Sequence, residues 1–226
     1  MIEAWSPLFI FGPPLAVGLL VWAGRRKGRQ GRRRADFISA FDYARLLDAR
    51  LGQRRPALDS EQRRSVLDGL AQWFEICRRA GRRPVSMPSQ AADDAWHEFI
   101  LFTRNYQAFC RQGLGRFLHH TPAEAMNSPA QASQGIRRSW RIACALEGID
   151  PRKPDRLPLL FALDAALALP DGFRYSLNCL AGSGPNPYCA SHIGCSSGCG
   201  TGGGSDNGGD AGGDGGGDGG GGCGGD

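Results

Sequence analysis

The sequence predicts an all-α fold, in which a globular domain of about five helices follows one transmembrane helix and precedes a disordered Gly-rich tail. Three observations support this prediction. Apolar residues between positions 36 and 164 recur with helical spacing. Capping patterns stand before several of these stretches, and no stretch alternates polar and apolar residues as a half-buried strand does. We therefore divide the chain into residues 1–34, 35–180 and 181–226.

The first part is predicted to be a transmembrane anchor with a basic juxtamembrane run. Residues 4–24 are almost wholly apolar, and as a helix they would span about 30 Å, the thickness of a bilayer's hydrocarbon core. Seven Lys or Arg follow within residues 25–34, which places the folded domain in the cytoplasm. A cleaved signal peptide and a buried core helix are the alternatives. A signal peptide would carry a positive charge before its apolar run, and this chain has none there. A buried core helix conflicts with the basic run that follows.

The charge distribution argues against a nucleic-acid surface. The net charge is +5, and residues 1–34 alone contribute +6, because seven Lys or Arg stand against Glu3. The basic excess thus lies mainly beside the apolar segment, where it indicates membrane topology. We expect a membrane and no nucleic acid as a partner of this chain.

The helices of the 35–180 domain are predicted in order. Residues 36–51 form the first, and a capping box at 59–62 starts the second, which ends near Gly81. The third runs from about Ser89 to Gln112, where Gly113 and Gly115 break it. A capping box at 121–124 opens a short helix, Pro129 starts another that ends at 150–151, and the last begins at 157 and stops at 170–172.

A cluster of metal-ligand residue types stands in the third helix and just after it. Asp93 and His97 are four residues apart and so share a helix face, while His119 and His120 follow the glycine break. Carboxylate and imidazole suit zinc or another divalent transition metal. The predicted site is Asp93 and His97 with His119 or His120, and water in an open position. Glu98 could then act as a general base. In the structural alternative these residues only cap and buttress the helices.

Three strings in this region resemble a known family: Asp93-x-x-Trp96-His97-x-Phe99, Tyr106-x-x-Phe109-Cys110 and Gly115-Arg-Phe-Leu-His-His120. Together with Arg156–Asp164 and the Cys/Gly-rich tail, they resemble the glycine-rich domain-containing protein family, and residues 36–226 are similar to its short bacterial members. The resemblance implies a helical domain of poorly defined biochemistry and supplies no catalytic residues. Some longer plant relatives carry an RNA-recognition motif, but this chain has no aromatic RNP-type strand.

The eight cysteines fall into two groups. Cys77, Cys110 and Cys144 lie on apolar helical stripes and are predicted to be buried free thiols. The others lie near the tail, where residues 200–226 contain 17 Gly and neither Lys nor Arg. This composition predicts a flexible coil that could hold a protein partner. Zinc, disulfides and unpaired thiols remain open alternatives for the segment that contains Cys189, His192, Cys195 and Cys199.

The sequence therefore leads to three functional hypotheses. The first is a membrane-anchored helical domain that binds a divalent metal or a small ligand near His97. The second is a metal-dependent hydrolase, with Glu98 as its base. The third is a structural adaptor without a site, which uses its tail for partners.

Overall fold

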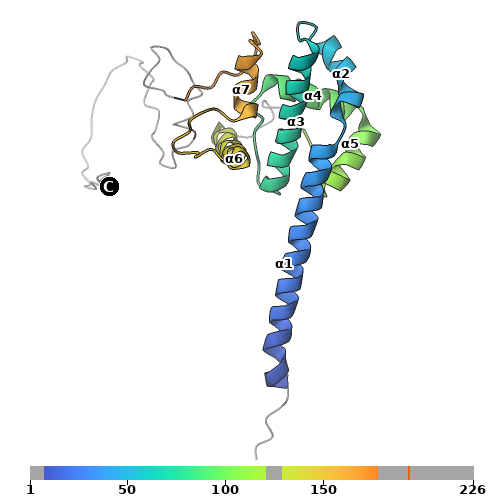
Figure 1. The fold of residues 1–226 in the computed structure, drawn as a ribbon, viewed down its shortest axis with the longest axis vertical. Helices are drawn as coiled ribbons and strands as arrows, with labels where there is room; N and C mark the ends of the chain where they lie inside the picture. Colours follow the sequence, from blue (N-terminus) through green and yellow to red (C-terminus); the bar gives the residue numbers. More distant parts are fainter. Residues whose placement is uncertain (1–7, 121–128, 178–192, 194–226) are drawn as a thin grey trace, which may run out of the picture. The chain divides into compact units, whose positions relative to one another are not determined.

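The computed structural model describes residues 8–120, 129–177 and 193, and within them the fold is all-α, as predicted, with no strand. Figure 1 shows how the helices are arranged. The elements are α1 (Leu8–Ala40), α2 (Tyr43–Arg54), α3 (Ser60–Ala80), α4 (Gln90–Leu101), α5 (Thr103–Phe109), the π-helical turn η1 (Cys110–Leu114), α6 (Pro129–Glu147) and α7 (Leu159–Ala166). These are seven α-helices, where about five were expected in the domain after one transmembrane helix.

The transmembrane helix predicted over residues 4–24 finds no support. Within the described residues, no helix combines the length and the apolar character that crossing a bilayer requires. α1 begins at Leu8, and its basic run begins at Arg25.

The single helix predicted over residues 36–51 is in fact two helices. α1 ends at Ala40, and α2 starts after Asp42, whose carboxylate accepts a hydrogen bond from the Arg45 amide at 3.1 Å. At this break the ring of Phe41 packs 4.9 Å from those of both Tyr43 and Phe109. Aromatic packing therefore accompanies the change of direction, and no glycine or proline is needed.

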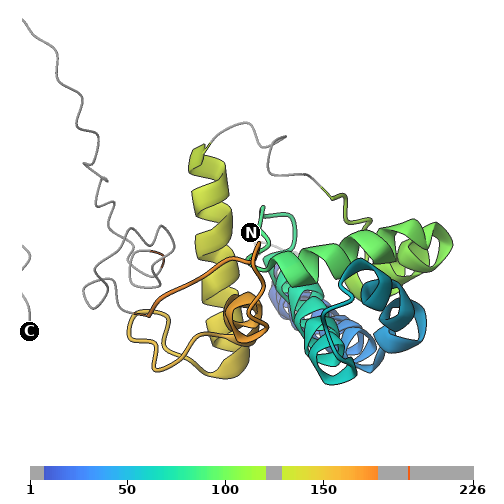
Figure 2. The same ribbon diagram turned by 90° about the horizontal axis from the view of Figure 1, so that it is seen from above.

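α3 is the central helix and contacts α1, α2, α4, α6 and α7 (Figure 2). Its predicted start is confirmed, because Asp59 and Gln62 form a reciprocal capping box. Its predicted end is also confirmed, with Gly81 as the C-cap at a φ of 65°. α7 approaches α3 so closely at Gly69 that an added Cβ would lie 2.8 Å from Leu163 Cδ2. A side chain there would separate the two helices.

The helix predicted from Ser89 to Gln112 begins as expected but is interrupted. Ser89 is the N-cap of α4, and the chain breaks at Phe102 before continuing as α5 and η1. The π-helical turn closes with a 2.8 Å hydrogen bond from the Gly115 amide to the Cys110 carbonyl, and Gly115 follows at a φ of 71°. The capping box predicted at 121–124 lies outside the described residues.

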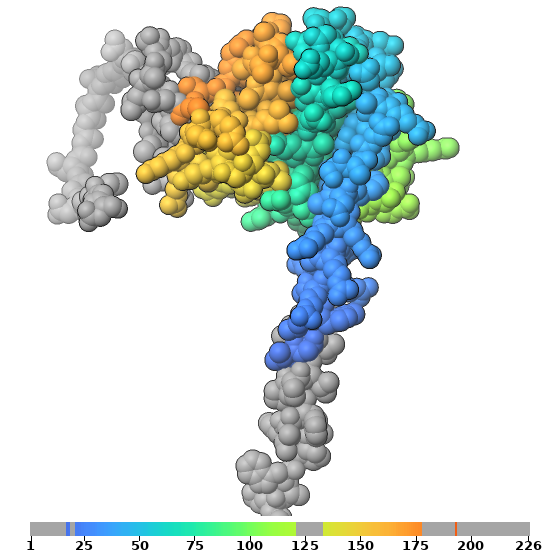
Figure 3. Space-filling model, in the orientation of Figure 1, coloured from blue at the N-terminus to red at the C-terminus, as the bar shows by residue number. Residues whose placement is uncertain are grey.

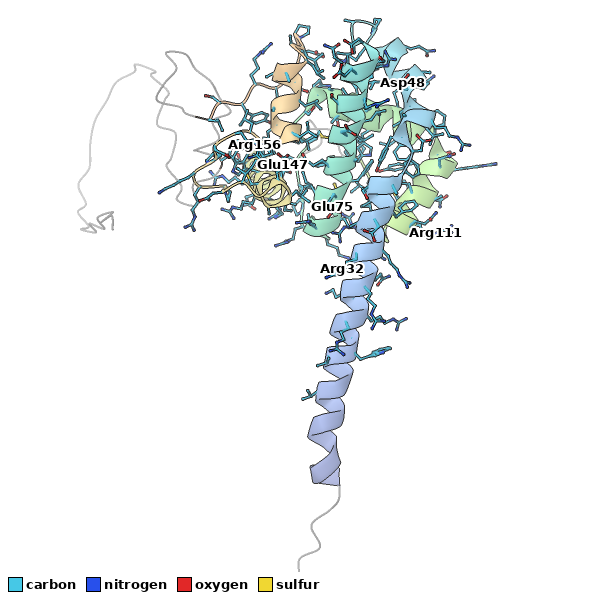
Figure 4. All side chains as sticks on the ribbon, viewed as in Figure 1. Arg32, Asp48, Glu75, Arg111, Glu147 and Arg156 are labelled. Atoms are coloured by element: carbon cyan, nitrogen blue, oxygen red, sulfur yellow. The ribbon has the colours of Figure 1, made fainter. Side chains whose placement is uncertain are left out.

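The start of α7 is capped by side chains from two other helices. Its N-cap residue is Pro158, which has no side-chain donor or acceptor to offer. Glu147 accepts from the Leu159 amide at 2.7 Å, and Gln72 accepts from the Leu160 amide at 3.0 Å. Arg156, which lies beside Glu147 in Figure 4, donates to the Glu147 carbonyl at 3.0 Å. This network joins α3, α6 and α7.

Cys77, Cys110 and Cys144 are buried free thiols, as predicted. Burial raises the pKa of the Cys144 thiol to about 12, and burial also raises the pKa values of the other two. Apart from Ile193, the tail from residue 181 onward lies outside the described residues. The alternatives for its cysteines, and the division at residues 34 and 180, stay predictions.

Candidate metal centre

α4 places Asp93 and His97 one turn apart on the same face, as the spacing predicts. The His97 Nδ1 atom lies 3.3 Å from Asp93 Oδ2 and 2.9 Å from the backbone carbonyl oxygen of Asp93. In the tautomer that carries a proton on Nδ1, His97 donates to that carbonyl. The Nε2 lone pair of His97 is then left for a ligand.

His120 joins this pair from the segment that follows η1. Its Nε2 atom lies 3.2 Å from Asp93 Oδ1, and its ring centroid lies 4.2 Å from that of His97. One potential ligand atom from each of the three residues lies within 4.8 Å of the others. The structure therefore brings Asp93, His97 and His120 together.

His119 does not join the cluster. It is exposed, and its ring packs 4.8 Å from that of Phe117. Successive side chains of an extended segment point to opposite sides, so only one of two adjacent histidines can face α4. Of the four predicted ligands, His119 is the one that the structure places elsewhere.

A buried hydrogen-bond chain fixes the segment that carries His120. The Trp96 indole Nε1 donates to the Tyr106 hydroxyl at 3.0 Å, and that hydroxyl donates to the Leu118 carbonyl at 2.6 Å. The Trp96 ring also packs edge-on against His120, with centroids 4.7 Å apart. Trp96 and Tyr106 thus hold the backbone two residues before His120.

Burial keeps the neighbouring phenol and thiol neutral. It raises the pKa of Tyr106 far above its ordinary value, so the hydroxyl remains a donor to Leu118. Burial also raises the pKa of Cys110, which opposes the thiolate form that binds metals. Cys110 is therefore part of the packing beneath the site, and it is absent from the three-residue cluster.

Asp164 secures the start of α4, a role that sequence analysis missed. This buried α7 carboxylate accepts from the Ser89 hydroxyl at 2.6 Å and from the Gln90 and Ala91 amides at 2.7 and 3.2 Å. The Phe173 amide donates to it at 2.8 Å. The only signal in the sequence was an acidic residue in the apolar run 157–164, where burial requires compensating donors.

An adjacent face of α4, about 100° round the helix, carries ion pairs to α2. Glu98, the base considered from sequence, is 8% exposed and bonds Arg50 at 2.8 Å. Asp94 is 2% exposed and bonds Arg54 and Arg55 at 3.0 and 2.6 Å. These two carboxylates fix α4 against α2, and they are not members of the histidine cluster.

The spacing of the three donors fits a small metal ion. Ligand atoms around a tetrahedral zinc ion lie about 3.3 Å apart when the bonds are about 2.0–2.1 Å long. The 3.2 Å between His120 Nε2 and Asp93 Oδ1 matches this value. The 3.3 Å to Asp93 Oδ2 belongs to His97 Nδ1, the nitrogen that bonds the Asp93 carbonyl, and not to the Nε2 atom that is left for a ligand. The side chains of Asp93, His97 and His120 are 21%, 43% and 17% exposed, so solvent reaches the cluster. Three protein donors beside solvent leave a fourth position for water.

Comparison with family models gives a match over residues 33–193, to the model described as UCP032817-like. The chain belongs to the UCP032817-like family. This family is uncharacterised, and its match spans the whole cluster. The predicted membership of the glycine-rich domain-containing protein family is therefore wrong. No curated protein and no solved structure matches the chain.

Proposed function

We propose that this protein is a helical domain that binds zinc or another divalent transition metal through Asp93, His97 and His120. The observation that carries the proposal is the convergence of one carboxylate and two imidazoles within 4.8 Å. Water would complete the coordination. A set of two nitrogens and one oxygen suits zinc and its neighbours in the transition series better than magnesium or calcium.

The surroundings of His97 support this proposal. Metal-binding histidines usually donate their second ring N–H to a carbonyl or a carboxylate, which fixes the ring and raises its basicity. The Nδ1 atom of His97 stands 2.9 Å from the Asp93 carbonyl, where such a bond would form. His120 is held by the ring contact with Trp96 and by the bond at Leu118. The same Asp–His distances also fit hydrogen bonds without a metal, and the titration below separates the two.

We favour a metal-binding domain over a metal-dependent hydrolase. A metal-dependent hydrolase needs a general base beside the metal-bound water. Glu98 was the base considered for this role, and its carboxylate is bonded to Arg50 from α2. The adaptor hypothesis assigns no role to the convergence of Asp93, His97 and His120, so we place it behind metal binding.

Calorimetric titration of zinc into the chelator-treated full chain tests the proposal. We expect the His97→Ala and His120→Ala variants each to bind one zinc ion fewer than the wild type, or to bind that ion at least about tenfold more weakly. His119→Ala is the matched control and should retain wild-type binding. Because each variant keeps the tail, zinc held by tail cysteines contributes equally to all. Equal stoichiometry and affinity in all four proteins would overturn the proposal.

A second proposal concerns the membrane partner, which we place at the surface of an anionic bilayer. Residues 21–30 of α1 are exposed (Figure 3), and they include Arg25, Arg26, Lys27 and Arg29. Trp22 is 58% exposed and lies under the Arg26 guanidinium at 5.3 Å. Basic residues near anionic lipid contribute about 1 kcal/mol each.

Vesicle sedimentation tests this second proposal. The wild type should sediment with phosphatidylserine vesicles, and the variant Arg25→Gln/Arg26→Gln/Lys27→Gln should remain largely in the supernatant. Phosphatidylcholine vesicles are the control for charge. Equal sedimentation of both proteins with phosphatidylserine would contradict it. A protein partner for the Gly-rich tail remains a separate proposal.

A further inference from the structure

A strongly basic cleft lies between the end of α3 and α6. The two helices contact each other and cross, since α3 runs vertically in Figure 1 while α6 is seen end-on. The volume of the cleft is about 660 Å³, within the usual range of small-ligand sites. Five of the residues that line it are arginines, and the described lining residues include no carboxylate. The arginines are Arg79, Arg83, Arg137, Arg138 and Arg141.

Helix geometry explains why these arginines meet. Arg137 and Arg141 are four residues apart on α6 and share one face, and Arg138 lies three residues before Arg141. Arg79 belongs to the last turn of α3, and Arg83 follows the Gly81 cap. The packing of α6 on α3 thus gathers charges from two distant parts of the sequence.

Much of this charge is not neutralised. Arg79 bonds Glu75 at 2.9 Å, but Glu75 is shared with Arg78 at 2.6 Å. Among the residues that the structure describes, Arg83 and Arg138 donate only to backbone carbonyls. Arg137 and Arg141 have no hydrogen-bond or ion-pair partner within the described part of the chain. A cleft lined by charges of one sign raises the local concentration of the opposite ion.

The chemistry of the lining points to phosphate groups. A guanidinium offers a planar fork of N–H donors that matches two phosphate oxygens, and several such forks suit a ligand with several phosphates. Ile142 and Ala145 add a small apolar wall. We propose that this cleft binds a small anion bearing a chain of phosphate groups, either an inorganic polyphosphate or a nucleoside triphosphate. Asp93, His97 and His120 are not among the described lining residues, so the site is independent of the metal proposal.

Titration with inorganic tripolyphosphate and with ATP at low ionic strength tests the inference. Arg137→Gln/Arg141→Gln should weaken binding about tenfold or more. The matched control is Arg104→Gln/Arg111→Gln, which removes the same charge from another cleft beside α5 and should change affinity less than about twofold. Arg137→Lys/Arg141→Lys keeps the charge without the planar fork. Its affinity for tripolyphosphate should therefore lie between those of the wild type and Arg137→Gln/Arg141→Gln.

The two ligands distinguish the sources of phosphate. Binding of both, with mutual displacement, identifies the phosphate chain as the recognised group. Binding of tripolyphosphate alone also supports the cleft and excludes the nucleoside. The inference is overturned by the absence of saturable tripolyphosphate binding, or by equal weakening in the glutamine variants of both clefts. It is also overturned if RNA or anionic vesicles bind through Arg137 and Arg141 without displacement by tripolyphosphate.

Discussion

Tyr106 is the residue that couples the core to the proposed metal site. Its hydroxyl accepts from Trp96 and donates to the Leu118 carbonyl, two residues before His120. Because these groups are buried, removing the hydroxyl leaves an indole N–H and a carbonyl without partners. The position of His120 and the stability of the fold should therefore respond together.

Tyr106→Phe should lower the free energy of unfolding by about 1–3 kcal/mol, the usual cost of leaving buried groups unpaired. It should also weaken zinc binding, because His120 loses its nearest backbone support. Tyr43→Phe is the matched control, since its buried hydroxyl bonds the Ile38 carbonyl at 3.1 Å. Urea unfolding and zinc titration measure the two effects. If Tyr43→Phe weakens zinc binding as much as Tyr106→Phe, the support for His120 does not depend on Tyr106.

At the scale of elements, two faces of α4 carry polar side chains with different roles. One carries Asp93 and His97, and the other carries Asp94 and Glu98 in ion pairs with α2. Its first turn is held by the α7 carboxylate of Asp164. α2 and α7 thus fix the axis of α4, and this axis sets where the ligands of α4 point.

Asp164→Asn should destabilise the protein by about 2–3 kcal/mol, because its buried carboxylate accepts hydrogen bonds from four groups and an amide nitrogen cannot accept them. The exposed Asp155 is the control, and Asp155→Asn should change stability by less than about 0.5 kcal/mol. Urea denaturation compares the two variants. A loss of similar size in both would show that Asp164 does not secure α4.

The parts of the fold that have local causes could be predicted from the sequence. The capping box at Asp59 and the Gly81 cap set the limits of α3, and both can be recognised from neighbouring residues. The break at Phe102 could not be predicted, because no glycine, proline or side-chain cap marks it. The break at Phe41 has one local signal, the Asp42 cap of α2, but neither glycine nor proline. The length of the apolar run suggested a membrane span that the described helix does not provide.

The candidate site was predictable only in part. The spacing of Asp93 and His97 fixes their common face, since helix geometry is regular. The choice between His119 and His120 depends on how the segment after η1 turns, and that is set by the buried bond at Leu118. The role of Asp164 depends on contacts with residues more than 70 positions away.

At the scale of the whole molecule, arginine–carboxylate pairs join distant segments. Arg55 bonds both Asp94 on α4 and Asp171 after α7. The hydrogen bond from Arg55 lowers the pKa of Asp171, and that from Arg63 lowers the pKa of Asp48. Burial opposes ionisation of Glu75, yet the hydrogen bonds from Arg78 and Arg79 together lower its pKa. All three carboxylates favour the folded state when they are ionised.

The sign of the resulting pH dependence follows from these shifts. A carboxylate with a lowered pKa in the folded state stabilises fully above its ordinary pKa, about 4, and loses this effect as pH falls through the folded value. The free energy of unfolding should therefore decrease from about pH 5 towards pH 3. Glu75→Gln should flatten this decrease. Urea unfolding at several pH values measures it, and an unchanged slope in the variant would contradict the assignment.

X-ray absorption at the zinc K-edge of the zinc-loaded full chain tests the proposed metal centre most directly. Coordination by Asp93, His97, His120 and water predicts a nitrogen and oxygen shell at about 2.0–2.1 Å, with the outer-shell scattering of two imidazoles. The His120→Ala variant should lose one imidazole. A sulfur shell at about 2.3 Å without imidazole scattering, or an unchanged spectrum in His120→Ala, would contradict the account, because the zinc would then be held elsewhere.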